Sequence, residues 1–296
     1  MLVRFGFEIS LQCTMPVPMT LALSPHSGFR ARRIGSDRVQ SEPQILVNEY
    51  IDAFGNRMSR IVAPPGMLTL WSDCAVESDG LPDPVIPEAR QLPVEQLPPE
   101  TLVYLRASRY CESDALVGRA WNIFGNTPEG WPRVQAICDF VHNHVTFGYQ
   151  FGRPTKTAQE VFVEKSGVCR DFAHLSIALC RAMNIPARYA SGYLGDIGVP
   201  PAGAGDFCAW FEAFLDGEWH TFDARYNTPR IGRVLMTRGY DAADVAMITS
   251  FGNYALTAFR VWCEEIPQHL DDNSVNCLLK MRPAADIPAI IPARVG

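Results

Sequence analysis

A cysteine opens a helix-like segment in the stretch 167–180, which reads GVCRDFAHLSIALC. From Cys169 onward, apolar side chains recur at helical spacing, and this predicts a helix over 169–183 that ends before Asn184 and Pro186. The first turn of a helix presents unpaired N–H groups and the positive end of the helix dipole, and both stabilise a thiolate. The same N–H groups can bind a developing oxyanion. Cys169 is therefore a candidate nucleophile, although a free cysteine more often packs as a small apolar residue.

Two strand-like segments follow this helix and form a predicted hairpin. They read DFCAWFEAFL and GEWHTFDAR, and the Asp216-Gly217 pair at their junction is typical of a two-residue hairpin loop. Side chains alternate between the two faces of a strand, and directly opposed residues share a face. The predicted register therefore places four side chains on one face of the sheet: Cys208, Trp210, Asp223 and Arg225.

These segments resemble a known family. GVCRDFAHL, IPARYASGYL, AWFEAFL and WHTFDAR occur here in this order, and together they resemble the transglutaminase-like superfamily of papain-fold cysteine enzymes. The resemblance covers residues 101–265 and is strongest to bacterial members with an N-terminal β-rich region, which are described as candidate cysteine proteases. It implies a Cys-His-Asp triad, with Cys169 as the nucleophile and Asp223 as the carboxylate that orients the base.

The base position departs from the family pattern. Members of the family carry histidine directly before Ala-Trp, whereas this chain has Cys208 before Ala209 and Trp210. In the triad template, loss of one member can lower the rate on the order of 10⁴-fold. Cysteine depends less on a base than serine does, because part of it is thiolate at neutral pH. Acyl transfer through Cys169 therefore remains the leading expectation.

The histidines of the chain are poor substitutes for the missing base. His220 pairs with Ala213 in the predicted register and lies on the opposite face of the sheet, unless a β-bulge intervenes. His174 lies about 140° around the helix from Cys169 and is expected to pack elsewhere. His142 and His144 occupy positions that are typical of a helix C-terminus. His26 and His269 belong to no motif.

The sequence leaves several functions open. The resemblance implies transfer of an acyl group from a peptide or amide carbonyl to Cys169, and then to water (protease or amidase) or to an amine (transglutaminase). The alternative is a catalytically impaired member that binds peptides or scaffolds a partner. A third possibility is a redox pair of Cys169 and Cys208, although the missing histidine ring would leave a gap wider than a disulfide allows. A metal site of both thiols with Asp223 has weak support, and no cofactor is implied.

Three side chains are candidates for substrate binding. Trp210 and Arg225 share the face of Cys208, and Tyr149 precedes the cysteine segment. Aromatic residues at strand spacing more often fill a core, so Trp210 also has that interpretation. Arg225 could lower the pKa of Cys169, as could Arg170.

The elements that position these residues predict an α+β fold. Strand-like runs separated by Pro and Gly precede residue 80, and helical patterns follow residue 100, with a capping box that starts a helix at Ala158. We expect four segments: an N-terminal antiparallel β-sandwich domain (1–79), a Pro-rich connector (80–100), a transglutaminase-like core with a cysteine-bearing helix packed on an antiparallel sheet (101–265), and a C-terminal arm (266–296).

Composition limits the partners. The net charge of -6 argues against general affinity for nucleic acid or anionic membranes. The nine cysteines include no C-x-x-C pair, and the N-terminus lacks an uninterrupted apolar core. These features predict a cytoplasmic protein with a peptide or protein substrate, and they specify no oligomeric state.

Overall fold

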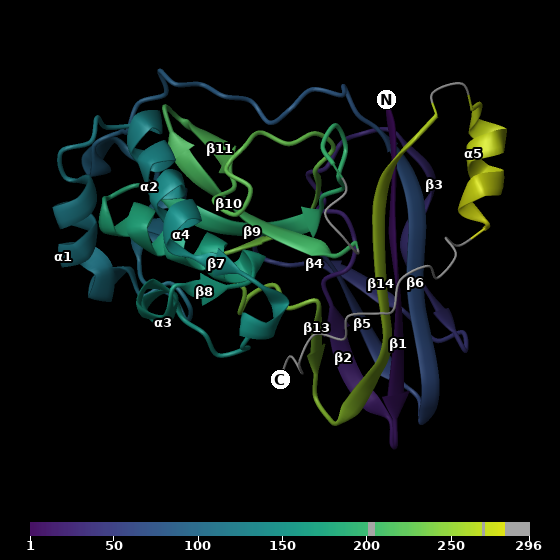
Figure 1. Ribbon diagram of the computed structural model, residues 1–296. Coiled ribbons are helices and arrows are strands. Elements are labelled where there is room, and N and C mark those ends of the chain that lie inside the picture. The colour runs from purple at the N-terminus through teal and green to yellow at the C-terminus, as the bar shows by residue number, and fades with distance from the viewer. Residues whose placement is uncertain (201–204, 268–269, 282–296) are drawn as a thin grey trace.

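The computed structural model describes residues 1–200, 205–267 and 270–281. Figure 1 shows two regions side by side: long strands form one, and helices around a smaller sheet form the other. The described sheets of four strands are antiparallel. Helices pack against the sheet of the second region, so the predicted α+β class is confirmed.

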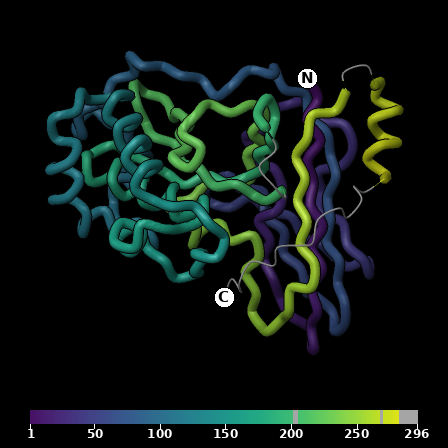
Figure 2. The backbone as a smooth tube through the Cα atoms, viewed as in Figure 1, coloured from purple at the N-terminus to yellow at the C-terminus, as the bar shows by residue number. Residues whose placement is uncertain are grey.

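The strand-rich region contains two sheets of four strands each. The first has the order β14-β1-β6-β3 and comprises Tyr254–Ile266, Leu2–Cys13, Gly66–Glu77 and Arg33–Glu42. The second has the order β13-β2-β5-β4 and comprises Ile248–Ser250, Val17–Leu21, Arg57–Ala63 and Asn48–Ile51. Strands β13 and β14 lie within the range that the sequence predicted for the core, but they complete the two N-terminal sheets. Figure 2 shows β14 running beside β1.

The third sheet has the order β11-β10-β9-β12 and carries the hairpin predicted from the sequence. Its strands are Glu218–Phe222, Phe207–Leu215, Ala187–Tyr193 and Val234–Gly239. Four helices belong to this region: α1 (Ser113–Phe124), α2 (Trp131–His144), α3 (Ala158–Glu164) and α4 (Cys169–Ala182). Two short parallel strands, β7 (Thr146–Phe147) and β8 (Ser166–Gly167), lead into α4. Short 3-10 helices occupy Val94–Gln96, Pro99–Leu105 and Tyr149–Phe151.

Helix α4 is the centre of the helical region. All residues from Asp171 to Ala182 are buried, and the helix packs against β10, β9 and the other three helices. The capping box at Thr157 and Glu160 starts α3 as predicted: Thr157 Oγ1 accepts the Glu160 N–H at 3.4 Å, and Glu160 Oε2 accepts the Thr157 N–H at 2.8 Å. Helix α4 is therefore held on several sides by β10, β9 and the helices α1, α2 and α3.

One apolar cluster joins the two regions. It contains Phe5 and Phe7 of β1 together with Tyr193 of β9 and Phe207 of β10. The rings of Phe5 and Tyr193 lie 4.8 Å apart, and those of Phe7 and Phe207 lie 6.3 Å apart. The strand that carries Cys208 therefore packs at its first residue against the N-terminal sheets.

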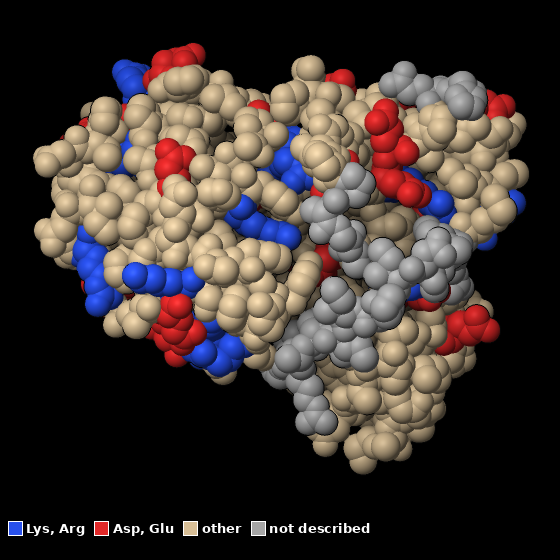
Figure 3. All heavy atoms as spheres, viewed as in Figure 1, with Lys and Arg blue, Asp and Glu red and all other residues tan. Residues whose placement is uncertain are grey.

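A fifth helix, α5 (Asp272–Leu279), packs on the outer side of the first sheet, where Val275 contacts Ile34 and Ala75. This helix lies in the segment predicted as a C-terminal arm, whose residues 282–296 and His269 lie outside the described residues. On the face shown in Figure 3, Lys and Arg side chains are spread beside Asp and Glu. No helix in the described ranges is long and apolar enough to cross a membrane.

Candidate active site

Cys169 is the first residue of α4 and is half-buried. Val168 before it is extended, and Asp171 Oδ2 accepts the Val168 N–H at 3.0 Å, which fixes the start of the helix. Arg170 Nη2 in turn holds Asp171 Oδ1 at 3.1 Å. The nucleophile proposed from the sequence thus lies where the helix N–H groups and the helix dipole act most strongly.

Cys208 lies directly against Cys169. Cys169 packs on the apolar cluster formed by Cys208, Trp210, Ala190 and Leu194. Cys208 is only 4% exposed, its Sγ contacts the Ala209 carbonyl at 3.8 Å, and its thiol acts as a hydrogen-bond donor that lowers the pKa of Cys169. The strand predicted to carry the base therefore does bring its residue to the nucleophile, but that residue is a second thiol.

The contact between the two thiols shifts their pKa values in opposite directions. The hydrogen bond from Cys208 lowers the pKa of Cys169, and the Arg225 guanidinium and the Ala209 N–H lower it further against the opposing effects of burial and of Asp206. The pKa of Cys208 is raised well above its ordinary value by the same hydrogen bond, by burial and by the charge of Cys169. Cys169 is therefore the more acidic thiol of the pair, and Cys208 is the less acidic one.

Arg225 supplies positive charge beside the two sulfurs. Its Nη1 lies 4.0 Å from Cys208 Sγ, and its guanidinium stacks over the rings of Phe147 at 3.8 Å and Tyr226 at 4.6 Å. His142 Nδ1 contacts the Arg225 carbonyl at 3.0 Å and so ties this loop to α2. A cation held in this way stabilises negative charge on Cys169.

Asp223 lies where β11 ends, and its catalytic role stays a prediction. The predicted hairpin register holds as far as Phe211 opposite Phe222, where β11 ends. The predicted pairs of Trp210 with Asp223 and of Cys208 with Arg225 are therefore wrong, because the chain turns at Asp223. Its Oδ1 accepts the N–H groups of Arg225 at 3.0 Å and Tyr226 at 3.2 Å, which is a turn that Asp side chains commonly form.

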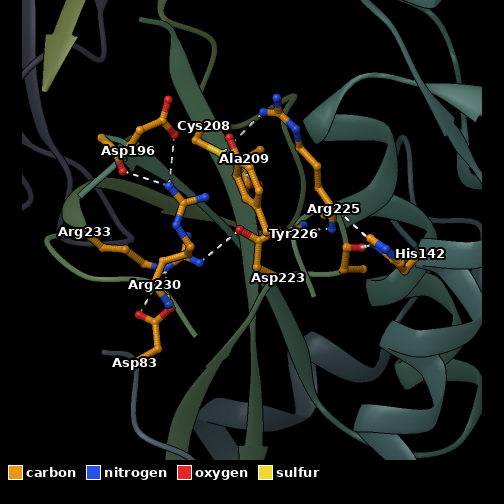
Figure 4. A network of polar contacts seen from close by, with 12 residues as sticks. Asp83, His142, Asp196, Cys208, Ala209, Asp223, Arg225, Tyr226, Arg230 and Arg233 are labelled. Atoms are coloured by element: carbon orange, nitrogen blue, oxygen red, sulfur yellow. Dashed lines mark hydrogen bonds and ion pairs between the residues drawn. The ribbon is translucent and has the colours of Figure 1, made fainter. Parts of the chain in front are cut away.

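The second oxygen of Asp223 belongs to a buried charge network, which Figure 4 shows from close by. Arg233 Nη2 donates to Asp223 Oδ2 at 2.9 Å, and Arg233 Nε donates to Asp83 of the Pro-rich connector at 2.8 Å. Nearby, Arg230 Nη2 donates to Asp196 Oδ1 at 3.1 Å. Asp223 thus shapes the loop that carries Arg225, and its carboxylate is neutralised by an arginine.

The predicted substrate-binding residues differ in their exposure. Trp210 is only 2% exposed and has the Arg233 guanidinium 4.9 Å above its ring, so it offers little surface to a ligand. Tyr149 is 39% exposed, and Arg225 is half-buried. The substrate-binding role of all three stays a prediction.

Asp206 is the site residue that the sequence interpretation missed. Its carboxylate is hydrogen-bonded to Tyr149, and burial raises its pKa to about 6, partly offset by the Phe207 N–H, by Tyr149 and by Arg225. Its charge also acts on Cys169, whose pKa it raises. Strand alternation was the available signal, since Asp206 lies two residues before Cys208 and so on the same face.

The described histidines lie elsewhere and are bonded to other groups. His220 is buried against Trp131 with its Nε2 3.2 Å from the Leu215 carbonyl, as the predicted strand parity implies. His174 accepts the Ala242 N–H at 3.1 Å. The remaining described imidazoles contact backbone carbonyls: His26 that of Phe54, His142 those of Ala224 and Arg225, and His144 that of Phe162. His142 and His144 lie in the last turn of α2, as the helix C-terminal interpretation expected, and both rings also contact carbonyls of other segments.

Comparison with known proteins bears on the family. The family model of the transglutaminase-like superfamily matches residues 120–224, a range that includes Cys169, Cys208 and Asp223. A crystal structure from Cytophaga hutchinsonii, described as that of "a Putative Cysteine Protease", is 30% identical and matches with a TM-score of 0.77 over 93% of this chain and 95% of that chain. This chain belongs to the transglutaminase-like superfamily.

Two mycobacterial proteins with similar sequences are described as uncharacterized. An uncharacterized protein from Mycobacterium leprae is 26% identical over 208 residues, which span 67% of this chain and 73% of that protein. An uncharacterized protein from Mycobacterium tuberculosis is 40% identical over 75 residues, which span 24% of this chain and 23% of that protein. Membership of the superfamily establishes the fold, and the site residues and the reaction are matters for proposal.

The weak metal-site interpretation finds no assembled ligand set. Among the described residues, no group of three His, Cys, Asp or Glu side chains is placed to hold a metal ion. Asp223, which that interpretation required, is paired with Arg233.

Proposed function

We propose that this transglutaminase-like protein transfers acyl groups from peptide or amide carbonyls through Cys169. The observation that carries the proposal is the position of Cys169: it begins α4 and has a pKa lowered by the Cys208 thiol and the Arg225 guanidinium. A thiolate that is populated at neutral pH can attack a carbonyl without a base to deprotonate it. The description of the Cytophaga hutchinsonii protein as a cysteine protease candidate supports the same reaction class.

In the first step, Cys169 Sγ attacks the carbonyl carbon and its oxygen becomes an oxyanion. The first N–H groups of a helix have no acceptor in a preceding turn, so those of Cys169 and Arg170, which precede the first backbone hydrogen bond of α4 from Asp171 to Val168, are suited to donate to this oxygen. The Cys208 thiol has no basic role here, because it holds its proton and donates it to the sulfur in a hydrogen bond. We infer that Cys208 stabilises the thiolate of the free enzyme.

The leaving amine needs a proton, which histidine supplies in the family triad. We infer that Asp206 provides it here. With its pKa near 6, a fraction of Asp206 is protonated at neutral pH, and its carboxyl is held by Tyr149 beside Cys169. Water or an amine then releases the acyl group from the thioester, and these two acceptors distinguish an amidase or protease from a transglutaminase.

The alternative function is peptide binding without turnover. Two observations favour it: Cys208 replaces the base, and Asp223 is neutralised by Arg233 and has no imidazole to orient. The superfamily fold around Cys169 would then serve to bind a peptide or to scaffold a partner.

The first test is the pH dependence of Cys169 alkylation by iodoacetamide, followed by mass spectrometry of the peptide that contains Cys169. We expect an apparent pKa below the ~8.5 of a free thiol in the wild type. Cys208→Ala should raise this pKa because the hydrogen bond is lost, and Cys277→Ala, which changes an exposed cysteine on α5, should leave it unchanged.

Turnover is then measured with peptide-amide substrates, with and without a primary amine. Cys208→His restores an imidazole at the base position and should raise kcat/KM by at least about tenfold if acyl transfer is the function. A wild-type thiol that titrates like a free cysteine and turns over no amide, together with measurable peptide binding, would support the binding function instead.

A further inference from the structure

The paired thiols suggest a second chemistry at the same site. The sequence suggested a gap where the histidine ring is missing, whereas the structure has Cys208 hydrogen-bonded to Cys169 and both packed in one apolar cluster. We propose that Cys169 and Cys208 form an oxidisable dithiol, which closes to a reversible disulfide when the protein meets a hydroperoxide. The inference shares Cys169 with the proposed acyl transfer but requires no acyl substrate.

The two cysteines have the properties of an attacking and a resolving thiol. Cys169 is half-buried, so a small oxidant can reach it, and the Arg225 guanidinium beside it favours its thiolate. Cys208 is 4% exposed and lies against Cys169, where it can react only with a neighbour. Sensitive cysteines are commonly accessible thiolates with a resolving cysteine close by.

The other thiols lack this combination. Burial raises the pKa of Cys74, Cys111 and Cys263 to about 12. The pKa values of Cys138 and Cys180 are also raised by burial, and both lie inside the core around α4. A small peroxide should therefore oxidise Cys169 before these five thiols.

The reaction balances in two steps. The Cys169 thiolate attacks one oxygen of the hydroperoxide, so an S–O bond forms, the O–O bond breaks, and the other oxygen leaves as water or an alcohol after taking a proton. The sulfur of Cys208 then attacks the sulfenic sulfur of Cys169, so the S–S bond forms, the S–O bond breaks, and the released hydroxide takes the Cys208 proton to leave as water. The two thiols are oxidised by two electrons and the hydroperoxide is reduced.

The consequence for the site is reversible loss of the nucleophile. A disulfide removes the thiolate but blocks further oxidation to sulfinic acid, which thiol reductants do not reverse. A histidine at position 208 would leave Cys169 without this resolving partner.

The test treats the intact wild-type protein with hydrogen peroxide, blocks the remaining thiols, and maps peptides by mass spectrometry. We expect a crosslink between the peptides that contain Cys169 and Cys208, and its removal by dithiothreitol. In Cys208→Ser, Cys169 should accumulate as sulfenic acid that dimedone traps, and it should reach sulfinic acid at least about tenfold faster than in the wild type. Cys277→Ser is the matched control and should behave as the wild type does.

Two outcomes would overturn the proposal: irreversible oxidation of wild-type Cys169 at the rate seen in Cys208→Ser without a crosslink, or crosslinks that join Cys169 to a different cysteine. Cys208→Ala, with its fold checked by circular dichroism, repeats the comparison if the serine variant is unstable. Amide turnover is measured separately under reducing conditions, so an absent disulfide and an absent acyl transfer are distinguished.

Discussion

Cys208 donates a hydrogen bond to the very sulfur that a base in its position would deprotonate. A histidine accepts the nucleophile's proton and later returns it to the leaving group, whereas a thiol of raised pKa does neither efficiently at neutral pH. The proton of Cys169 must therefore be lost to solvent, and a different group must protonate the leaving amine. Asp206 is the titratable carboxyl whose charge acts on Cys169.

Asp206→Asn tests this residue through stability and turnover together. The folded pKa of Asp206 is raised from 3.8 to about 6, so folding favours its protonated form. That stabilisation is fully present below pH 4 and is lost as the pH rises through 6. The variant should therefore match the wild type in the free energy of unfolding at pH 4 and be more stable at pH 8 by about 1–2 kcal/mol, the shift being discounted for partial exposure. Urea unfolding at both pH values measures this.

The same variant should alkylate faster at Cys169, because a repulsive charge is removed, and should turn over amide substrates more slowly, because the acid is removed. Asp114→Asn changes an exposed carboxylate in α1 and should alter neither property. Unchanged amide turnover in Asp206→Asn would exclude Asp206 as the proton donor.

At this scale helix periodicity placed Cys169 at the start of a helix, and the family resemblance placed Cys208 at the base position beside it. The sequence did not single out Asp206. Parity put Asp206 on the right face, but its burial and its bond to Tyr149 depend on where the 3-10 helix 149–151 packs, and no local spacing encodes that.

At the scale of elements, the hairpin was predictable for most of its length. Asp216 and Gly217 adopt positive φ values of 50° and 89°, and the pairing follows the predicted register as far as Phe222. The register fails at Asp223, because its side chain accepts backbone N–H groups locally and ends the strand. Short polar side chains at strand ends compete with sheet pairing in this way, and the periodicity of a sequence does not reveal this competition.

Asp171→Ala tests how firmly the start of α4 is held. The variant removes the acceptor of the Val168 N–H and the partner of Arg170, both at a buried position. We expect the free energy of unfolding to fall by about 1–3 kcal/mol, since the partly buried Val168 N–H loses its acceptor. Thermal unfolding followed by circular dichroism measures the change.

The matched control is Asp114→Ala, which removes a first-turn carboxylate from α1 at an exposed position and should cost at most about 1 kcal/mol. Equal effects of the two substitutions would show that Asp171 contributes through helix propensity and dipole alone. In that case the start of α4 would be held chiefly by the packing of its later residues.

At the scale of the whole molecule, the two regions share one core. Tyr193 and Phe207 come from the sheet that carries Cys208, and they pack with Phe5 and Phe7 from the N-terminal sheet. The N-terminal region thus contributes to the position of Cys208 at the beginning of β10. Composition and Pro clusters predicted the strands and the connector, but not this shared cluster, because contacts between distant segments leave no local pattern.

Phe5→Ala should therefore destabilise both regions together. Loss of a fully buried phenylalanine should cost about 3–5 kcal/mol and lower the midpoint of a single cooperative transition. Differential scanning calorimetry, with cleavage of each region by a protease followed in parallel, checks this. Val62→Ala on β5, where the side chain is 56% exposed, is the control and should change the midpoint little. Two separate transitions in Phe5→Ala would contradict a shared core.

The pairing of β14 with β1 also orders events during synthesis. The ribosome completes the N-terminal strands first, yet β1 and β2 are edge strands until β14 and β13 pair with them. The intervening segment, with α4 and the cysteine pair, emerges before those edges are covered. An unpaired apolar strand such as β1 invites association with other chains. Association of nascent chains through β1 is therefore expected until residues 254–266 are free to pair with it, and not afterwards.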